Sequence, residues 1–359
     1  MSSRRLGVDA RELLGDTTGV GRYLGELLHR WTTRADASSR RFILYAPEPL
    51  QVSFPYADVR VLGGGRGTWW EQTTLSTAVG RDRPHVFFAP AYTAPARLSP
   101  PLVVTIHDVS FSRHPEWFSF REGTRRRWLT RSAARRAATV LTDSQFSARE
   151  IEDLYGVAPE RIAVVPVGVT PRHAGVQART PLVLYTGSLF NRRRLPDLIA
   201  AFARVVHSVR DARLVIVGKD RTFPRQDLRA IAASHGVESQ VVLRDYVADQ
   251  ELGTLYGSAS AFAFLSEYEG FGLTPLEALA AGVPIVVLDT PVAREIYADA
   301  AEFVAKGDVR GAADAISRLL TSSAARQAQL EQAPAVLQRY SWDVAADRTL
   351  AILEKAARR

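Results

Sequence analysis

The sequence predicts an α/β protein of two domains, each built on a doubly wound parallel sheet. The chain has 359 residues, of which 46% are hydrophobic, and this is enough for two cores of ordinary size. Short β-branched runs alternate with helix-length stretches, which is the pattern of βαβ units. A polar stretch, Thr170–Thr180, interrupts the pattern and contains Pro171, so we expect it to be the linker between the domains.

The expected strands form one set on each side of this linker. Before it come Leu6–Asp9, Phe42–Tyr45, Val59–Leu62, Val86–Ala89, Leu102–Ile106 and Thr139–Thr142. After it come Leu182–Thr186, Leu214–Val217, Val241–Leu243, Ala261–Leu265 and Pro284–Leu288. Open parallel sheets bind ligands beside the carboxyl ends of their strands, so the residues that follow these runs are the candidates for a functional site.

The composition limits the chemistry. Cysteine is absent, which excludes disulfides, thiolate zinc sites and thiol nucleophiles. No apolar run approaches the ~20 residues of a membrane-spanning helix, and Met1–Asp9 lacks the apolar segment of a secretory signal. We therefore expect a cytoplasmic protein, soluble or peripheral at the inner face of the membrane. The net charge of +8 fits a polyanionic partner, and it fits a compositional bias toward arginine equally well.

Two positions in the N-terminal half place glycine or polar residues after a strand. Gly19 and Gly21 precede an expected helix, Tyr23–Trp31, in a loop that lets the backbone approach a phosphate or a sugar. His107 follows the strand Leu102–Ile106 at the expected ligand edge. Each has a second interpretation, since a tight turn also uses glycine and a buried histidine also bonds to backbone or to a carboxylate.

An expected helix over residues 121–136 is unusually rich in arginine. Seven arginines accompany Trp128 and Leu129 there. Two interpretations stay open: a solvated helix whose apolar face packs on the sheet, or a face that binds an anionic membrane surface.

The most informative segment is Glu267–Pro284, which runs from a buried strand through a glycine turn into a short helix. Gly270 and Gly272 expose backbone amides next to the helix N-terminus, where a diphosphate binds favourably. Glu269 supplies a carboxylate at the same turn, which suits the hydroxyl groups of a ligand. The turn therefore predicts a site for a diphosphate joined to a hydroxylated group.

The helix after this turn carries the signals of a capping box. Thr274 is expected as the N-cap, Pro275 as the first helical residue and Glu277 as the third. Gly282 is expected to end the helix. Capping alone accounts for Glu277, but it does not account for the carboxylate before the turn.

The spacing of Glu269 and Glu277, within the sequence Tyr268–Pro284, resembles the retaining glycosyltransferases of family 4, which have the GT-B fold. The segments Val8–Arg11 and Thr18–Tyr23 are similar to the N-terminal signature of bacterial mannosyltransferase-like members of this group (glycosyl transferases group 1). The resemblance spans almost the whole chain.

The resemblance implies two Rossmann-like domains facing a central cleft. Residues 1–169 would form the acceptor-binding domain, completed by a C-terminal helix over roughly residues 341–359. Residues 180–340 would form the domain that binds the nucleotide-sugar donor.

The resemblance also implies roles for individual residues. Glu277 would bind the ribose hydroxyls and Glu269 the hydroxyls of the transferred sugar. The family usually has lysine at Arg193 and often arginine or threonine at Ser188, both near the phosphates, so this chain departs at both positions. Of the three consecutive arginines we favour Arg193. The expected catalytic residues are His107, which would position the sugar, Glu269 and Arg193, and the expected donor-binding residues are Gly19, Gly21, Ser188, Arg192, Arg193, Tyr246, Val247, Glu269, Gly270, Phe271, Gly272, Leu273 and Glu277.

The implied reaction moves a hexose from a nucleoside diphosphate sugar to an acceptor hydroxyl with retention at the anomeric carbon. By resemblance we favour GDP-mannose as donor and a role in polysaccharide or glycoconjugate synthesis, with a glycan, a lipid-linked or a small-molecule acceptor. The chain contains no Asp-x-Asp motif, so we predict no metal and no other cofactor, and the leaving diphosphate would be stabilised by arginine and backbone amides.

Three other functions compete with this one. The first is a UDP-sugar-dependent glycosyltransferase acting on a small molecule, and the second is a nucleotide-sugar epimerase of the same fold. The third is nucleic-acid binding, suggested by the basic charge, which we reject because it leaves Glu269 and Glu277 unexplained.

Overall fold

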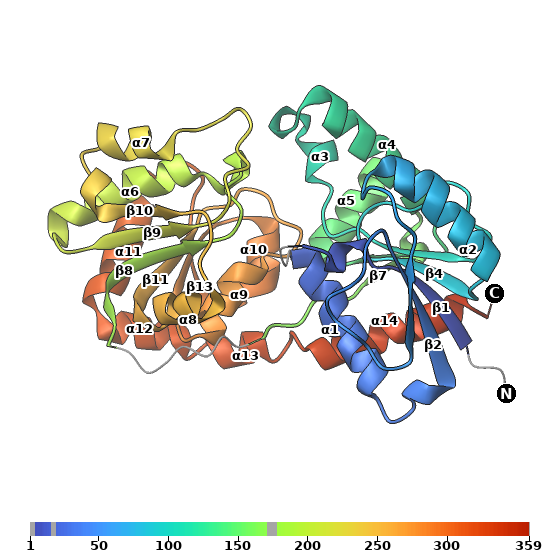
Figure 1. Ribbon diagram of the computed structural model, residues 1–359. Coiled ribbons are helices and arrows are strands. Elements are labelled where there is room, and N and C mark those ends of the chain that lie inside the picture. The colour runs from blue at the N-terminus through green and yellow to red at the C-terminus, as the bar shows by residue number, and fades with distance from the viewer. Residues whose placement is uncertain (1–3, 16–18, 171–177, 359) are drawn as a thin grey trace. The chain divides into compact units, whose positions relative to one another are not determined.

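The computed structural model describes residues 4–15, 19–170 and 178–358. The chain divides into two compact units, each with its own parallel sheet (Figure 1). Unit 1 comprises Met1–Pro115, Phe120–Gly168 and Ser341–Arg359, and unit 2 comprises Glu116–Ser119 and Val169–Tyr340. Most of the expected linker, residues 171–177, lies outside the described residues.

Unit 1 contains a seven-stranded parallel sheet with the strand order β3-β2-β1-β4-β5-β6-β7. Its strands are β1 (Arg4–Asp9), β2 (Arg40–Ala46), β3 (Ala57–Val61), β4 (Val86–Ala89), β5 (Leu102–Thr105), β6 (Thr139–Thr142) and β7 (Ile162–Val164). The sequence predicted the first six. It did not predict β7, because this edge strand has three half-buried residues and no longer apolar run.

The helices of unit 1 are α1 (Gly19–Thr33), α2 (Ser76–Asp82), α3 (Ser110–Arg113), α4 (Phe120–Arg136), α5 (Gln145–Tyr155) and α14 (Trp342–Ala356). Helix α1 starts earlier than expected, so Gly19 and Gly21 lie in its first turn and the prediction of a glycine loop at these two residues is wrong. Buried Tyr23, Leu24 and Leu27 anchor the helix, and this packing extends it back over the glycines despite their low helix propensity.

Unit 2 contains a six-stranded parallel sheet with the order β10-β9-β8-β11-β12-β13. Its strands are β8 (Thr180–Thr186), β9 (Arg213–Val217), β10 (Val241–Arg244), β11 (Ala259–Phe264), β12 (Ile285–Leu288) and β13 (Ala301–Val304). Its helices are α6 (Leu195–Ser208), α7 (Leu228–Ser234), α8 (Asp249–Ser258), α9 (Leu273–Ala280), α10 (Pro291–Tyr297), α11 (Val309–Thr321), α12 (Ser323–Leu330) and α13 (Ala333–Leu337). Of these strands only β13 was not predicted, because its sequence, Ala-Glu-Phe-Val, contains a glutamate and gives no β-branched run.

Each sheet reverses its strand order once, between β1 and β4 in unit 1 and between β8 and β11 in unit 2. The connections on the two sides of such a reversal leave toward opposite faces of the sheet. The loops at the carboxyl ends of the two central strands therefore separate, and this is where doubly wound sheets bind ligands. In unit 2 these loops follow Thr186 and Phe264.

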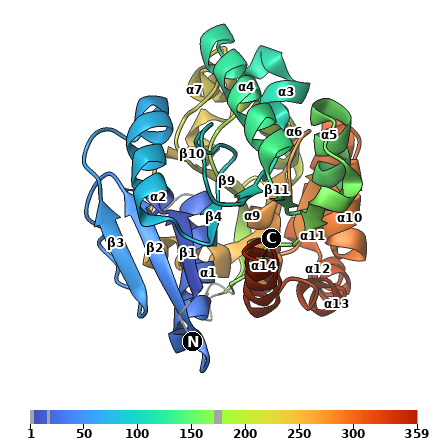
Figure 2. The same cartoon turned by 90° about the vertical axis from the view of Figure 1, so that its right-hand side faces the viewer.

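The same topology leaves part of one sheet face to be covered by a later helix. Right-handed crossovers place the helices that connect β4, β5 and β6 on one face. Helix α14 covers the other face, where it packs against α1 and against β4, β5 and β6 (Figures 1 and 2). In unit 2, α11 has the equivalent place and packs against α6, β8 and β11 to β13.

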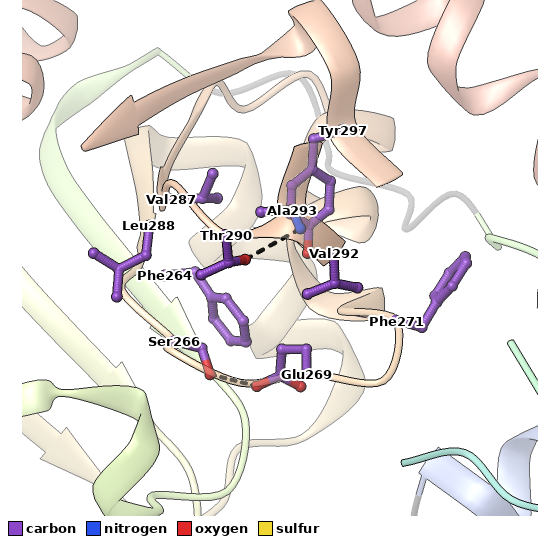
Figure 3. A pocket seen from close by; sticks show the side chains of 10 residues that line it. All are labelled: Phe264, Ser266, Glu269, Phe271, Val287, Leu288, Thr290, Val292, Ala293 and Tyr297. Carbon is purple, nitrogen blue, oxygen red and sulfur yellow. Dashed lines mark hydrogen bonds between the residues drawn. The ribbon is translucent and has the colours of Figure 1, made fainter. Parts of the chain in front are cut away.

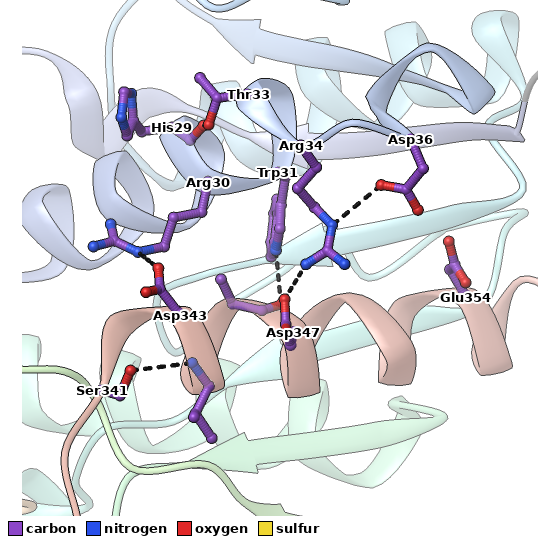
Figure 4. A network of polar contacts seen from close by, with 12 residues as sticks. His29, Arg30, Trp31, Thr33, Arg34, Asp36, Ser341, Asp343, Asp347 and Glu354 are labelled. Atoms are coloured by element: carbon purple, nitrogen blue, oxygen red, sulfur yellow. Dashed lines mark hydrogen bonds and ion pairs between the residues drawn. The ribbon is translucent and has the colours of Figure 1, made fainter. Parts of the chain in front are cut away.

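Helix α14 is attached to the rest of unit 1 by a buried hydrogen bond and by surface ion pairs (Figure 4). The indole nitrogen of Trp31 donates to the carbonyl of Ala346 at 2.8 Å. Trp31 is fully buried and stacks on Phe42 with ring centres 5.7 Å apart. Arg30 pairs with Asp343 at 2.6 Å in an exposed position. The buried indole is therefore expected to contribute most to the attachment.

Replacing Trp31 by phenylalanine should lower the free energy of unfolding by about 1–3 kcal/mol, because the indole hydrogen bond to Ala346 is lost and the smaller ring leaves space in the core. The matched control is Arg34→Ala, which removes an exposed ion pair to Asp347 in the same interface and should cost less than about 1 kcal/mol. Urea-induced unfolding measures both. Equal losses would contradict the dominance of the buried indole.

Candidate functional site

The carboxyl ends of β8 and β9 approach each other through two glycines. Gly187 follows β8 with φ +130°, and its amide donates to the carbonyl of Val217 at 2.9 Å. A Cβ atom on Gly218, which has φ +159°, would lie 1.9 Å from the carbonyl oxygen of Gly187. Only glycine fits this approach, which fixes the course of the loop containing Ser188 and the arginines after it.

Two of the three consecutive arginines in this loop face Glu269, which follows β11. Arg193 forms an ion pair with the Glu269 carboxylate, and its guanidinium lies 4.4 Å from the ring centre of Phe264. The Nε atom of Arg192 lies 4.0 Å from the same carboxylate. The loops after β8 and β11 therefore bring two adjacent arginines next to a glutamate that is 76 residues away from the nearer one in the sequence (269 − 193 = 76).

Arg194 differs from its two neighbours. It has a left-handed backbone conformation, with φ +50°. Its guanidinium pairs with Asp197 at 2.6 Å and with Glu267 at 3.4 Å, and Glu267 also pairs with Lys306. These contacts occupy Arg194 in a separate network, so Arg192 and Arg193 remain as the residues that can bind a ligand beside Glu269.

The charges at Glu269 are only partly balanced. Two guanidinium groups face one carboxylate, and the three side chains are only 10–13% exposed. Within the described residues, the Nε atoms of Arg192 and Arg193 have no hydrogen-bond partner. Because an unpaired buried donor is costly, this combination favours a bound anion.

The turn after Glu269 requires glycine at position 272. Gly272 has φ +88°, and a Cβ atom on it would lie 2.1 Å from the hydroxyl oxygen of Tyr297. That hydroxyl donates to the Gly272 carbonyl at 2.7 Å. Figure 3 shows the small pocket between the turn and α10, which Glu269 and Phe271 also line and which has room for about one water molecule. The pocket is too small to hold a nucleotide.

The predicted capping box is wrong. Helix α9 begins at Leu273 with Gly272 as its N-cap, because the left-handed glycine turns the chain into the helix before Thr274. Glu277 therefore lies within the helix, where it is only 3% exposed. Capping does not explain this buried carboxylate. Because glutamate is rarely buried, Glu277 becomes a stronger candidate for a binding residue.

In unit 1, His107 follows β5 and is held from both ring nitrogens. Its Nδ1 lies 2.7 Å from Oδ2 of Asp143, and its Nε2 lies 3.1 Å from the carbonyl oxygen of Pro90. The rings of Tyr23 and Tyr92 pack edge-on against it, with centres 5.0 and 5.7 Å away. Both polar partners only accept hydrogen bonds, so the geometry fits the doubly protonated, positively charged ring.

The environment of His107 supports that charge state. Burial alone lowers the pKa of the ring, but the Asp143 carboxylate and the acceptor at Pro90 outweigh it and raise the pKa above its usual value. Sequence reasoning did not include Asp143 in the site. The signal was available, because Asp143 directly follows β6, the neighbour of β5 in the sheet.

Two family models match the chain. Residues 17–173 match the model described as Glycosyltransferase Family 4, and residues 171–336 match the model described as Glycosyl transferases group 1. The chain belongs to the family 4 glycosyltransferases. This family membership and the enzyme class were predicted from the sequence and are confirmed.

Relatives of this glycosyltransferase include two mannosyltransferases. The chain is 29% identical to the MMP alpha-(1->4)-mannosyltransferase of Mycolicibacterium hassiacum over 356 residues, 94% of this chain and 79% of the relative. It is 29% identical to the GDP-mannose:cellobiosyl-diphosphopolyprenol alpha-mannosyltransferase of Xanthomonas campestris over 250 residues, 67% and 64% of the two chains. The sucrose-phosphate synthase structure from Thermosynechococcus elongatus matches with a TM-score of 0.78 at 17% identity and covers 98% of each chain. The predicted GT-B fold is confirmed.

Except for Gly19 and Gly21, which lie in α1 of unit 1, the other donor-binding residues predicted in the glycosyltransferase lie along the same edge of the unit 2 sheet. Phe271 packs edge-on against Tyr340 with ring centres 5.1 Å apart, and Leu273 is the first residue of α9. After β10, Tyr246 is 78% exposed whereas Val247 is buried. Their roles toward a donor stay predictions.

A second buried network of the glycosyltransferase lies at the end of β1. Arg11 pairs with Asp9 at 2.9 Å and also with Glu71, which is buried in the π-helical segment Trp70–Leu75 that precedes α2. Glu71 accepts hydrogen bonds from Thr93 and Gln72 as well. Burial raises the pKa of Asp9 to about 6, although Arg11 opposes the shift. Because the carboxylates of Asp9 and Glu71 are already bonded within the network, we infer that the network holds the loops at the carboxyl edge of the unit 1 sheet in place.

Among the residues that the structure describes, no three His, Asp or Glu side chains come together in a group that could hold a metal ion. Among the helices of the described residues, none is long and apolar enough to cross a membrane.

Replacing Gly272 by alanine should destabilise the glycosyltransferase by about 1–3 kcal/mol, because alanine is strained at this φ and its Cβ meets the Tyr297 hydroxyl. Gly80→Ala, in helix α2 with open space around its Cα, is the matched control and should be neutral or stabilising. Thermal unfolding measures both. A neutral Gly272→Ala would contradict the tight turn.

Replacing Asp143 by asparagine should lower the pKa of His107 by about one unit or more, because the ring loses its negative partner. Titration followed by NMR of the imidazole measures the shift. The pKa is raised in the folded protein, so the charged ring stabilises the fold at low pH, and this contribution is lost as the pH rises through the folded-state pKa. An unchanged pKa in the variant would contradict the pairing.

Proposed function

We propose that this glycosyltransferase transfers mannose from GDP-mannose to an acceptor hydroxyl, with retention, in polysaccharide or glycoconjugate synthesis. The observation that carries the proposal is the pair of arginines facing Glu269 at the point where the unit 2 sheet reverses its strand order. The choice of donor follows from two relatives that are named mannosyltransferases, one of them with GDP-mannose in its name.

In this proposal the diphosphate binds Arg193 and Arg192. Their buried, unpaired Nε donors would bond to phosphate oxygens, and arginine can present two parallel N–H groups to a phosphate. The backbone amides from Gly270 to Leu273 and the loop at Ser188 would bind the remaining oxygens. These groups would stabilise the charge that develops on the leaving diphosphate, with no metal needed.

The hydroxylated parts of the donor would bind the two glutamates. Glu269 would accept hydrogen bonds from the sugar and Glu277 from the ribose, while the backbone at Tyr246 and Val247 would hold the base. Glu269 and Arg193 form an ion pair with each other. With a donor, the carboxylate would turn to the sugar and the guanidinium to the diphosphate.

The chemical step would be a front-face displacement. The bond from the anomeric carbon to the phosphate oxygen breaks, and the acceptor oxygen bonds to the same face of that carbon. The leaving phosphate oxygen takes the acceptor proton. His107 would position the donor and would not act as a base, because both of its ring nitrogens already face acceptors. Gly19 and Gly21 would contribute through the first turn of α1.

Two alternatives fit the same architecture. A UDP-sugar-dependent transferase acting on a small molecule would share the arginines and glutamates, and differ in the contacts to the base. A nucleotide-sugar epimerase would need no acceptor, so it would produce an altered sugar from the donor alone.

The proposal is tested by measuring the binding of GDP, UDP, ADP, TDP and their common sugars, without metal, by thermal shift and calorimetry. GDP-mannose at 100 times its Kd should stabilise the wild type by about 2.7 kcal/mol. Glu277→Ala should lose most of this stabilisation, because the ribose hydroxyls lose their acceptor. Glu331→Ala, an exposed site in unit 2, is the matched control and should keep it.

A preference for UDP-sugars would replace mannose transfer by the first alternative. If no nucleotide sugar binds but DNA does, the proposed function is wrong.

A further inference from the structure

The outward face of helix α4 is rich in positive charge. The helix contains seven arginines and one glutamate. Its inward face buries Leu129, Thr130, Ala133 and Ala134 against the unit. Gly123 is buried as well, and most of the other positions are exposed, on the side of the sheet opposite α14 (Figure 2). One face of the helix therefore packs against unit 1, and the composition of the other, exposed face has no explanation in packing.

Large aromatic side chains occupy this second face. Phe120 is 82% exposed and Trp128 is 66% exposed. Trp69, which is 81% exposed, lies beside α4 because Arg125 donates a hydrogen bond to the neighbouring Thr68. Single exposed aromatics are common, but three on adjoining elements mark an interaction surface. We call Trp69, Phe120, Trp128, Arg121 and Arg131 the α4 face.

The positive charge of the α4 face is not compensated. The only glutamate of the helix, Glu122, is paired with Arg126. Toward the C-terminal end, Arg135 donates to the carbonyl of Tyr155 and Arg136 to that of Ala96. Arg121 and Arg131 are exposed and make no ion pair or hydrogen bond among the residues that the structure describes. The face therefore offers free guanidinium groups next to exposed aromatic rings.

We propose that the α4 face binds the surface of an anionic membrane. Tryptophan and phenylalanine favour the interfacial layer of a bilayer, and arginine is attracted to acidic headgroups. The outward side of a helix is convex, which fits a lipid surface, whereas proteins that bind single-stranded nucleic acid hold it in a basic groove. Membrane binding would bring the enzyme to a lipid-linked acceptor, and only this purpose rests on the proposed function.

The test measures sedimentation of the full chain with vesicles of phosphatidylcholine, with and without phosphatidylglycerol, in the absence of donor and acceptor. The wild type should bind the anionic vesicles at low salt, and high salt should weaken the binding. Binding is measured apart from donor affinity, so its failure is distinct from failure of the proposed function. No preference for the anionic vesicles would overturn the proposal.

Two variants separate charge from aromatic insertion. Arg121→Glu with Arg131→Glu should weaken binding by at least about 25-fold, since each arginine near an anionic surface contributes about fivefold. Trp69→Ala with Trp128→Ala should remove the blue shift of tryptophan fluorescence that vesicles produce in the wild type. Arg204→Glu with Arg310→Glu, exposed in unit 2, is the charge-matched control and should bind normally.

Because all these side chains are on the surface, circular dichroism should show the same fold for each variant. Normal vesicle binding by both α4 variants would overturn the proposal. Tighter binding to a single-stranded oligonucleotide than to anionic vesicles, lost in the α4 variants, would also overturn it and assign the face to nucleic acid.

Discussion

The site in unit 2 depends on the reversal of strand order between β8 and β11. Because the chain leaves these neighbouring strands toward opposite faces, their two loops diverge at the carboxyl edge, which is where such sheets bind ligands. Gly187 and Gly218 fix the first loop and Gly272 fixes the second. The reversal also leaves one sheet face incompletely covered, and this explains the position of α11. The same constraint in unit 1 explains why α14, the last helix of the chain, packs beside α1.

The reversal brings Arg192 and Arg193 next to Glu269, and their electrostatics connect the fold to the reaction. Burying two cations with one anion is unfavourable unless each group is paired and hydrogen-bonded. The stacking of the guanidinium groups on Phe190 and Phe264 compensates part of that cost. In the proposed function, the donors that remain unpaired would be arranged in advance for the diphosphate. Such preorganisation is the usual source of charge stabilisation in a transition state.

Much of the fold could be predicted from the sequence, because buried parallel strands are continuous β-branched runs. Eleven of the strands were visible in this way, whereas β7 has only three residues and β13 contains a glutamate, so neither gives such a run. The family also followed from the sequence, since the spacing of Glu269 and Glu277 is specific. Helix starts were less predictable. At Gly272 a left-handed glycine displaced the expected N-cap, and at Gly19 tertiary packing extended a helix through glycines.

The partners of the site residues could not be predicted, because they depend on pairs of loops far apart in the chain. The sequence gives no reason for Arg194 to turn toward Asp197 while its two neighbours turn to Glu269. The pairing of His107 with Asp143 depends on the adjacency of β5 and β6. The order of the strands in the sheet decides which loops are neighbours, and this order is known only from the structure.

In the proposed function, the ion pair between Glu269 and Arg193 opens when the donor binds. Glu269 then bonds to the sugar and Arg193 to the diphosphate. Calorimetry of GDP, which has no sugar, tests this exchange of partners most directly with two variants. Arg193→Gln should weaken GDP binding by about tenfold or more, since a charge-assisted hydrogen bond contributes about 1.5–3 kcal/mol. Glu269→Gln should bind GDP as tightly as the wild type or more tightly, because it frees Arg193 for the diphosphate. Equal weakening by both variants would contradict the claim.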